Sequence, residues 1–204
     1  MHGLFSVMTG IYIDHVVRID FKGFEKLIDQ VGGITIYRDT PFAEAKQWVQ
    51  DGREGKTYWR KDKEGWTFYV PAGENFMSSE DALYYARSRY SSSDFDRMKR
   101  QQEVIGSIKS KVLGLGVLAN PVKILQILKI LENHLRIKSF AEGEELQGLV
   151  KLAQRAKVQD LAQMVLDDSA NGLLVADTID GRFVLLPKSG DYSKIQALFK
   201  GIVD

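Results

Sequence analysis

Apolar and polar side chains alternate near the start of the chain, as in a strand that has one covered face. The residues that share this face are Ile11, Ile13, Val17, Ile19 and Phe21. The period then changes to that of a helix, with an apolar stripe formed by Phe24, Leu27, Ile28 and Val31. Asp20 is placed to begin this helix, and Gly32-Gly33 to end it. Residues 34–37 form a second strand, so the order strand, helix, strand predicts an α/β sheet with a crossover.

The same two periods, together with capping and turn residues, predict the remaining elements. In chain order these are a hairpin at 56–70, a short helix from Ser78 or Ser79 to Ala86, a long helix from Asp94 to about Leu113, a helix opened by Asn120-Pro121, a helix at about 141–155, a hairpin around Asp180-Gly181 and a helix capped by Asp191. We therefore expect an α/β fold, with residues 1–204 in a single domain.

The amino-acid composition excludes several classes of function but says little about the fold. The chain of 204 residues has 28 basic and 27 acidic side chains and a net charge of +1, so no overall field favours nucleic acid or an anionic membrane. Cysteine is absent, which excludes disulfides, thiolate metal sites and cysteine nucleophiles. No apolar run reaches the roughly 18 residues of a membrane span, and residues 1–4 do not resemble the start of a signal peptide. Any site for a polyanion must therefore be local.

The candidate chemistry lies in residues 87–102, where arginines and a serine-rich connection precede the long helix. If that helix begins at Asp94, the 100° step places Asp94, Arg97 and Gln101 on the face that its apolar residues bury. Buried polar groups without partners cost roughly 1 to 3 kcal/mol each, so these three side chains need each other or a ligand.

Arg87 and Arg89 reach the same end of the helix. Guanidinium groups bind phosphate in a bidentate fork, and the first turn of a helix adds free N–H groups. The cluster therefore suits a phosphate or pyrophosphate, and the apolar continuation of the helix face suits an apolar chain attached to it. An arginine–aspartate network that only fixes the turn explains the spacing equally well.

Several motifs in a fixed order give the chain a family resemblance. Residues 82–89 (Ala-Leu-Tyr-Tyr-Ala-Arg-Ser-Arg), 94–97 (Asp-Phe-Asp-Arg) and 100–102 (Arg-Gln-Gln) resemble the signature of the LytR-CpsA-Psr family. Residues 10–34 and Ala72-Gly73-Glu74 are similar to two further segments of that family, in the same order. The ordered series is far more specific than any one of its motifs.

The resemblance implies an α/β/α sandwich with a central mixed sheet and an apolar pocket for a polyprenyl chain. It implies transfer of a polyprenyl-pyrophosphate-linked anionic glycopolymer, such as teichoic acid or capsule, onto peptidoglycan, with Mg²⁺ at the pyrophosphate. Carried over by position, the ligands of the phosphate or lipid are Arg87, Arg89, Arg97, Arg100 and Gln101, and the catalytic residues are Arg87, Arg89, Asp94 and Arg97. Asp94 would hold the arginines or the metal, and the guanidiniums would stabilise charge on the transferred phosphoryl group.

Parts of the family pattern have no counterpart here. The family's membrane helix, its magnesium-binding acidic residues and an arginine beside an Asp-Thr pair all precede the segment that begins here at Gly10. Arg38-Asp39-Thr40 follows that segment and so stands in the wrong order, and Asp96 replaces a glycine that is usual in the family. We therefore expect the carboxyl-terminal portion of a protein with a single membrane anchor, on the extracytoplasmic face of the bacterial cell membrane. By itself this portion is expected to be soluble and inactive.

Two other functions are compatible with the motifs. A transcriptional regulator or attenuator, a role associated with the family's name, normally has a basic stripe or a helix-turn-helix, and the sequence has neither, so we expect no nucleic-acid partner. A noncatalytic binder of cell-wall lipid intermediates would use the same arginine cluster without transferring the polymer.

Weaker signals favour structural roles. His2, His15 and His134 lack ligand spacing, and His15 is predicted to pack in the core. Gly114–Ala119 follows a helix, so a helix stop is favoured over a dinucleotide-binding loop. For the aromatic residues near the first hairpin, cross-strand packing is favoured over stacking on sugars; they are Trp48, Tyr58, Trp59, Trp66 and Phe68.

Overall fold

The computed structural model describes residues 2–12, 16–45, 53–63, 65–114, 120–131, 134–138 and 166–203. The predictions that fall on His15, on Trp48 and on a helix at 141–155 lie outside these ranges. The helices are α1 (His2–Thr9), α2 (Phe21–Gln30), α3 (Ser79–Arg87), α4 (Asp94–Gly114), α5 (Pro121–Leu131) and α7 (Ser193–Val203). The strands are β1 (Val16–Ile19), β2 (Ile34–Arg38), β3 (Phe42–Ala45), β4 (Trp59–Asp62), β5 (Gly65–Val70), β6 (Gly73–Met77), β7 (Leu135–Lys138), β8 (Leu174–Ile179) and β9 (Arg182–Pro187).

Contacts divide the chain into two compact units. The larger unit consists of Val17–Arg136 and Phe140–Gln159, and the smaller of Met1–Val16, Ile137–Ser139 and Asp160–Asp204. Two contact units do not test whether the chain is one domain, so the single domain expected over residues 1–204 stays a prediction. None of the helices in the described ranges has the length and apolar character that crossing a bilayer requires.

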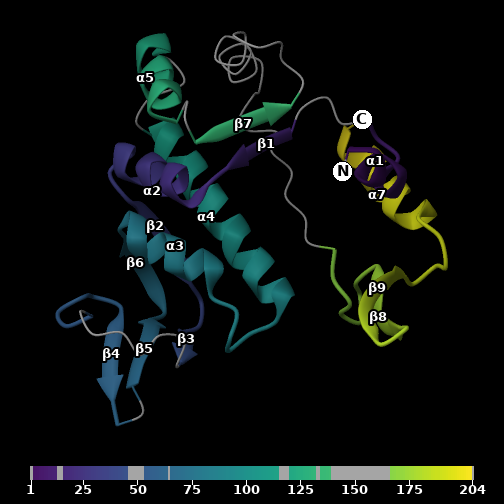
Figure 1. Cartoon of the computed structure of the whole chain (residues 1–204), viewed down its shortest axis with the longest axis horizontal. Helices are drawn as coiled ribbons and strands as arrows, with labels where there is room; N and C mark the ends of the chain where they lie inside the picture. The colour runs from purple at the N-terminus through teal and green to yellow at the C-terminus, as the bar shows by residue number, and fades with distance from the viewer. Residues whose placement is uncertain are drawn as a thin grey trace. The chain divides into compact units, whose positions relative to one another are not determined.

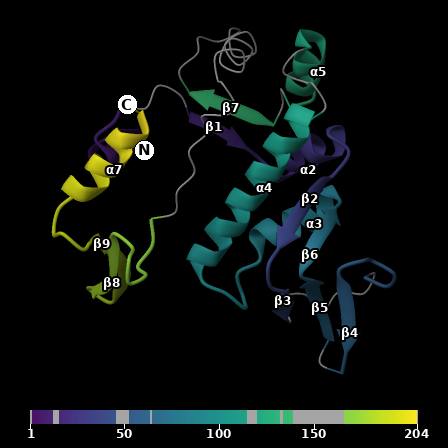
Figure 2. The same cartoon turned by 180° about the vertical axis from the view of Figure 1, so that it is seen from behind.

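Helices of the larger unit pack against one another and against short sheets. α3 contacts α2 and α4, α4 also contacts β2, and α2 contacts α5. Figure 1 shows the long α4 passing α3 and β2, and Figure 2 shows the same packing from behind. The core that results draws buried apolar side chains from α2, β2, β3, the β4–β5 hairpin, β6, α3 and α4.

Short antiparallel sheets replace the predicted crossover. β2 pairs with β6, and β5 lies between β3 and β4, in both cases antiparallel. The α/β class is confirmed, but β1 pairs with β7, so the two strands that flank α2 belong to different sheets. The sequence did not predict these pairings, because the alternation of apolar and polar residues determines which face of a strand is buried but not which strand it pairs with. In β2, Ile34 and Ile36 face inward opposite Met77 and Asn75.

The predicted hairpin aromatics pack across the strands. Tyr58, Trp59, Trp66 and Phe68 are all buried. Trp59 lies directly opposite Phe68 in the β4–β5 register, with 5.4 Å between their ring centroids. Cross-strand packing is therefore confirmed for Trp59 and Phe68, and Tyr58 also packs on Phe68, with 5.9 Å between their ring centroids. Trp66 lies opposite Lys61, whose Nζ atom is 5.4 Å from the ring centroid.

Capping residues set the helix ends, as the sequence predicted. Side-chain oxygens of Asp20, Ser78 and Asn120 accept hydrogen bonds from N–H groups in the first turns of α2, α3 and α5, at 2.7, 3.2 and 3.0 Å. After α2, Gly32 and Gly33 have φ angles of 74° and 81°, a region that favours glycine. α4 extends to Gly114, where this described range ends, so the helix stop expected at Gly114–Ala119 stays a prediction.

In the smaller unit, α1 packs on α7 and β8 pairs with β9. The Gln196 side chain donates to the Val7 carbonyl oxygen at 2.9 Å, which joins the two helices. Asp180 and Gly181, with φ of 52° and 72°, form the tight turn of the hairpin. Asp191 accepts from the Ser193 N–H at 3.0 Å at the start of α7.

Candidate functional site

The start of α4 in the larger unit is built by a reciprocal cap. The Ser93 hydroxyl accepts from the Asp96 N–H at 3.1 Å and donates to the Asp96 carboxylate at 2.8 Å. That carboxylate also accepts from the Ser93 N–H at 3.1 Å. The bond from the Ser93 hydroxyl is the main reason why the pKa of Asp96 is lowered from its ordinary value. Asp96, the residue that departs from the family pattern, thus stabilises the helix end that carries the site.

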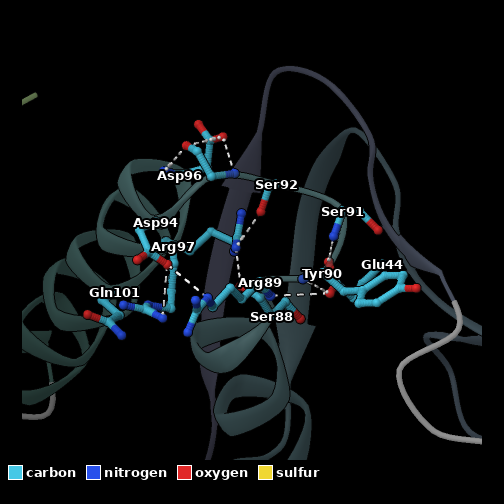
Figure 3. Close-up of polar contacts among 12 residues, drawn as sticks. Glu44, Ser88, Arg89, Tyr90, Ser91, Ser92, Asp94, Asp96, Arg97 and Gln101 are labelled. Carbon is cyan, nitrogen blue, oxygen red and sulfur yellow. Dashed lines mark hydrogen bonds and ion pairs between the residues drawn. The ribbon is translucent and has the colours of Figure 1, made fainter. Parts of the chain in front are cut away.

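Asp94 holds two of the predicted arginines together. Its Oδ1 atom lies 3.0 Å from Arg89 Nε and 3.2 Å from Arg97 Nη1. Figure 3 shows the Arg89 and Arg97 side chains meeting at this carboxylate, with Gln101 close to Arg97. Arg89, Asp94 and Gln101 are exposed and Arg97 is half-buried, so the prediction that Asp94 and Gln101 lie on the buried face of α4 is wrong. The pair of guanidiniums is open to a ligand.

An apolar cavity of about 370 Å³ begins beside this group. Arg87 and Gln101 are in its wall, and the remaining lining residues come from β1, α2, α3 and α4 or immediately precede α2: Ile19, Asp20, Phe21, Phe24, Leu83, Ala86, Val104 and Ile105. The Arg87 guanidinium lies over the Phe21 ring, 4.3 Å from its centroid. The Gln101 side chain donates to the Ala86 carbonyl oxygen at 3.3 Å, next to Arg87 in α3. Cationic and amide groups therefore border a space whose walls are mostly apolar.

Arg100 does not join this group. Its side chain is 3% exposed and donates to the Tyr85 carbonyl oxygen at 3.2 Å, to the Ser92 hydroxyl at 2.9 Å and to the Ser88 carbonyl oxygen. The guanidinium also lies over the Phe42 ring, 4.5 Å from its centroid. The sequence predicted that Arg100 is a ligand of the phosphate or lipid. In the structure its side chain instead stabilises the turn before α4 through these contacts.

Glu44 is a residue that the sequence prediction missed. Its side chain is 0% exposed, and its carboxylate accepts hydrogen bonds from the backbone N–H groups of Arg89, Tyr90 and Ser91. Burial raises the pKa of Tyr84 to about 12, and the charge of Glu44 contributes to this shift. Alternation in β3 could have found it, because Glu44 shares the inward face with Phe42.

The residues of this site do not by themselves fit a magnesium ion. Mg²⁺ is usually held by one or two carboxylates together with water and substrate phosphate oxygens. In the described ranges no three His, Cys, Asp or Glu side chains gather in a way that could hold a metal. The carboxylate nearest the guanidiniums, that of Asp94, is shared by Arg89 and Arg97. His134 contacts Asp20 and Lys26, each at 3.0 Å, and so has a structural role.

Together, fold and site define an α/β protein with a cationic group at an apolar cavity. The model of the LytR_cpsA_psr family matches residues 4–197 of this chain. The chain therefore belongs to the LytR-CpsA-Psr family.

Two relatives illustrate the sequence similarity. The cell wall biosynthesis protein LcpA of Corynebacterium glutamicum is 30% identical over 152 residues, which are 71% of this chain and 25% of that protein. The polyisoprenyl-teichoic acid–peptidoglycan teichoic acid transferase TagV of Bacillus subtilis is 30% identical over 156 residues, 74% of this chain and 35% of TagV. The chain thus spans between a quarter and about a third of these relatives.

Solved structures share the fold. Protein gbs0355 of Streptococcus agalactiae matches with a TM-score of 0.67 and 22% identity, over 98% of this chain and 60% of that one. TagV of B. subtilis matches with a TM-score of 0.61 and 21% identity, over 98% and 68%. TagT bound to LIIa-WTA matches with a TM-score of 0.62 and 16% identity, over 98% and 66%. The fold of these proteins is the fold predicted from the motifs.

Proposed function

We propose that this chain contributes the phosphate and lipid site of a glycopolymer phosphotransferase. The whole protein would transfer a polyprenyl-pyrophosphate-linked anionic glycopolymer onto peptidoglycan at the extracytoplasmic face of the membrane, held there by an anchor. Relatives named as teichoic acid transferases and a cell wall biosynthesis protein support this assignment. The structural neighbour TagT, which was solved bound to LIIa-WTA, further supports the proposal.

The observation that carries the proposal is the cavity beside the guanidiniums. Arg87 and Gln101 lie in the wall of a mostly apolar space of about 370 Å³, and Arg97 is one helical turn before Gln101 in α4. A polyprenyl phosphate matches this arrangement, because it has an anionic phosphate head that suits the arginines and an apolar chain that suits the cavity. Burying the chain is favourable by about 25 cal/mol per Å² of apolar surface, and the arginines bind the head.

Transfer at this site would form one bond and break one. An acceptor hydroxyl oxygen of peptidoglycan attacks the phosphorus that bears the glycopolymer, and the bond from that phosphorus to the bridging oxygen breaks. Polyprenyl phosphate leaves, and the hydroxyl proton passes to solvent. Arg89 and Arg97 would stabilise the negative charge on the phosphoryl oxygens, and Arg87 would hold the departing lipid phosphate at the cavity.

The binding test compares two anions by calorimetry: farnesyl pyrophosphate and inorganic pyrophosphate. We expect farnesyl pyrophosphate to bind more tightly, because only it has a chain that fills the cavity. Ile105 lines the cavity and is 52% exposed, so Ile105→Trp should fill that space without burying a new group in the core. It should weaken binding of farnesyl pyrophosphate by about tenfold and leave pyrophosphate unchanged.

The matched control is Ile179→Trp in β8. Ile179 is 48% exposed and is not among the residues that line the cavity, so the same substitution is made at similar exposure outside the cavity wall. This variant should bind both anions like the unmodified protein. Equal affinity of the unmodified protein for the two anions, or an equal effect of the two tryptophans, would count against a lipid site.

A further inference from the structure

Glu44 lies beneath the turn that carries Arg89. In β3, Phe42 and Glu44 occupy alternate positions and both are buried, Glu44 with 0% exposure. A buried carboxylate is costly unless hydrogen bonds and nearby positive charge compensate it. An apolar side chain would fill this buried position as well, so packing alone does not explain why a carboxylate is present at Glu44.

The compensation comes from three successive backbone N–H groups. Glu44 Oε1 accepts from Arg89 N at 3.2 Å and from Tyr90 N at 2.5 Å, and Oε2 accepts from Ser91 N at 3.1 Å. Figure 3 shows the carboxylate of Glu44 facing this stretch of backbone. Successive N–H groups that converge on one anion form a nest, which fixes the local backbone.

Arg100 binds the same turn by donating hydrogen bonds to acceptor oxygens of the turn. It donates to the carbonyl oxygen of Ser88 and to the hydroxyl of Ser92, on either side of the residues that Glu44 holds. The two charged side chains come from β3 and α4, so the connection between α3 and α4 is fastened to two different elements. Its conformation is therefore determined by tertiary contacts.

We propose that Glu44 is a positioning residue, which fixes the turn at Arg89–Ser91 so that the Arg89 guanidinium stands beside Arg97. The backbone N–H of Arg89 is held by Glu44 while its Nε atom reaches Asp94 at 3.0 Å, so the anchored residue is the one that presents the charge. This inference rests on the proposed function, since it assigns Glu44 a role in binding the same phosphate.

The informative variant is Glu44→Gln, which keeps the size of the side chain. Its amide has one acceptor oxygen and an NH₂ group, and because both carboxylate oxygens now accept from N–H groups, one contact becomes donor against donor. Glu74→Gln is the matched control, because Glu74 is exposed on β6. Circular dichroism verifies that each variant is folded. If Glu44→Gln unfolds, Glu44→Asp keeps the charge but is too short to reach all three N–H groups, and it should give smaller changes of the same kind.

Two measurements separate positioning from general destabilisation. Amide hydrogen exchange by NMR should show protection at Arg89, Tyr90 and Ser91 reduced by about fivefold or more in Glu44→Gln, and unchanged in Glu74→Gln. Binding of farnesyl pyrophosphate should weaken by about tenfold in Glu44→Gln and in Arg89→Ala. The double variant should bind no more weakly than Arg89→Ala alone, since Glu44 acts through Arg89.

The outcomes that overturn the two proposals differ. Additive losses in the double variant, or unchanged protection at Arg89–Ser91 in Glu44→Gln, would refute the positioning role even if the unmodified protein binds farnesyl pyrophosphate. A protein that binds no farnesyl pyrophosphate would refute the proposed function, and with it the ligand that Glu44 is proposed to serve.

Discussion

At the scale of single residues, one carboxylate organises the candidate site. Asp94 Oδ1 forms ion pairs with both Arg89 and Arg97, so its charge offsets the repulsion between the two guanidiniums. The three groups are at least partly exposed, so each ion pair by itself contributes little stability. In the function that we propose, this arrangement prepares the site for an anion.

Arg97→Ala should therefore affect function and leave stability nearly unchanged. Loss of one hydrogen bond between charged groups, about 1.5 to 3 kcal/mol, should weaken binding of farnesyl pyrophosphate by roughly 10- to 100-fold. Lys99→Ala removes the same charge from an exposed position of α4 and should bind like the unmodified protein. Calorimetry measures the affinities, and urea unfolding measures the stabilities. Equal affinities of the two variants would contradict a role for Arg97.

At the scale of elements, the amino terminus of α2 forms part of the cavity wall. Asp20 caps the helix by accepting from Gly23 N at 2.7 Å, and its two carboxylate oxygens each lie 3.0 Å from His134 Nδ1. The pKa of Asp20 lies below its ordinary value of 3.8. The largest cause is the hydrogen bond from the Gly23 N–H, and the next is the hydrogen bond with His134. The cap and the contact to the segment before β7 thus hold α2 where Phe21 and Phe24 line the cavity.

This cap predicts a pH dependence of stability. Because the pKa of Asp20 is lowered on folding, its contribution is fully present above the ordinary value of 3.8 and is lost as the pH falls through the lowered pKa. Asp20→Asn has no carboxyl group to titrate. The difference in unfolding free energy between the two proteins, from urea titrations, should therefore be largest at neutral pH and shrink below about pH 4. A difference that stays constant with pH would show that Asp20 makes no charge-dependent contribution.

At the scale of the whole molecule, charge is balanced and the cationic group is local. The net charge is +1, from 28 basic and 27 acidic side chains. Proteins that bind duplex DNA contact several phosphates over an extended basic surface, and their affinity falls steeply with salt. A site that binds one phosphate or pyrophosphate needs only a few convergent guanidiniums, as at the start of α4.

We accordingly expect no binding of duplex DNA at about 150 mM salt, a concentration at which nonspecific contacts are weakened. Fluorescence anisotropy with a labelled duplex measures this, and farnesyl pyrophosphate binding in the same buffer is the positive control. Micromolar affinity for the duplex, lost on raising the salt, would instead favour a transcriptional regulator.

Local interactions explain which parts of the fold could be predicted. Asp20, Ser78 and Asn120 cap helices through N–H groups within three residues, and Asp180-Gly181 closes its hairpin by its own backbone angles. Strand partners could not be predicted in this way. β2 joins β6 across more than thirty residues, and its alternation is compatible with many partners.

The candidate site divides along the same line. The amino-acid sequence by itself determined the motif, the start of α4 at Asp94 and the helical spacing that puts Arg97 and Gln101 on one face of α4. Only the tertiary structure decided that Arg100 is buried under the turn and that Glu44, 45 residues before Arg89, holds the same turn. The physical reason is that a side chain's chemistry is local, whereas its burial and its partners depend on segments that folding brings together.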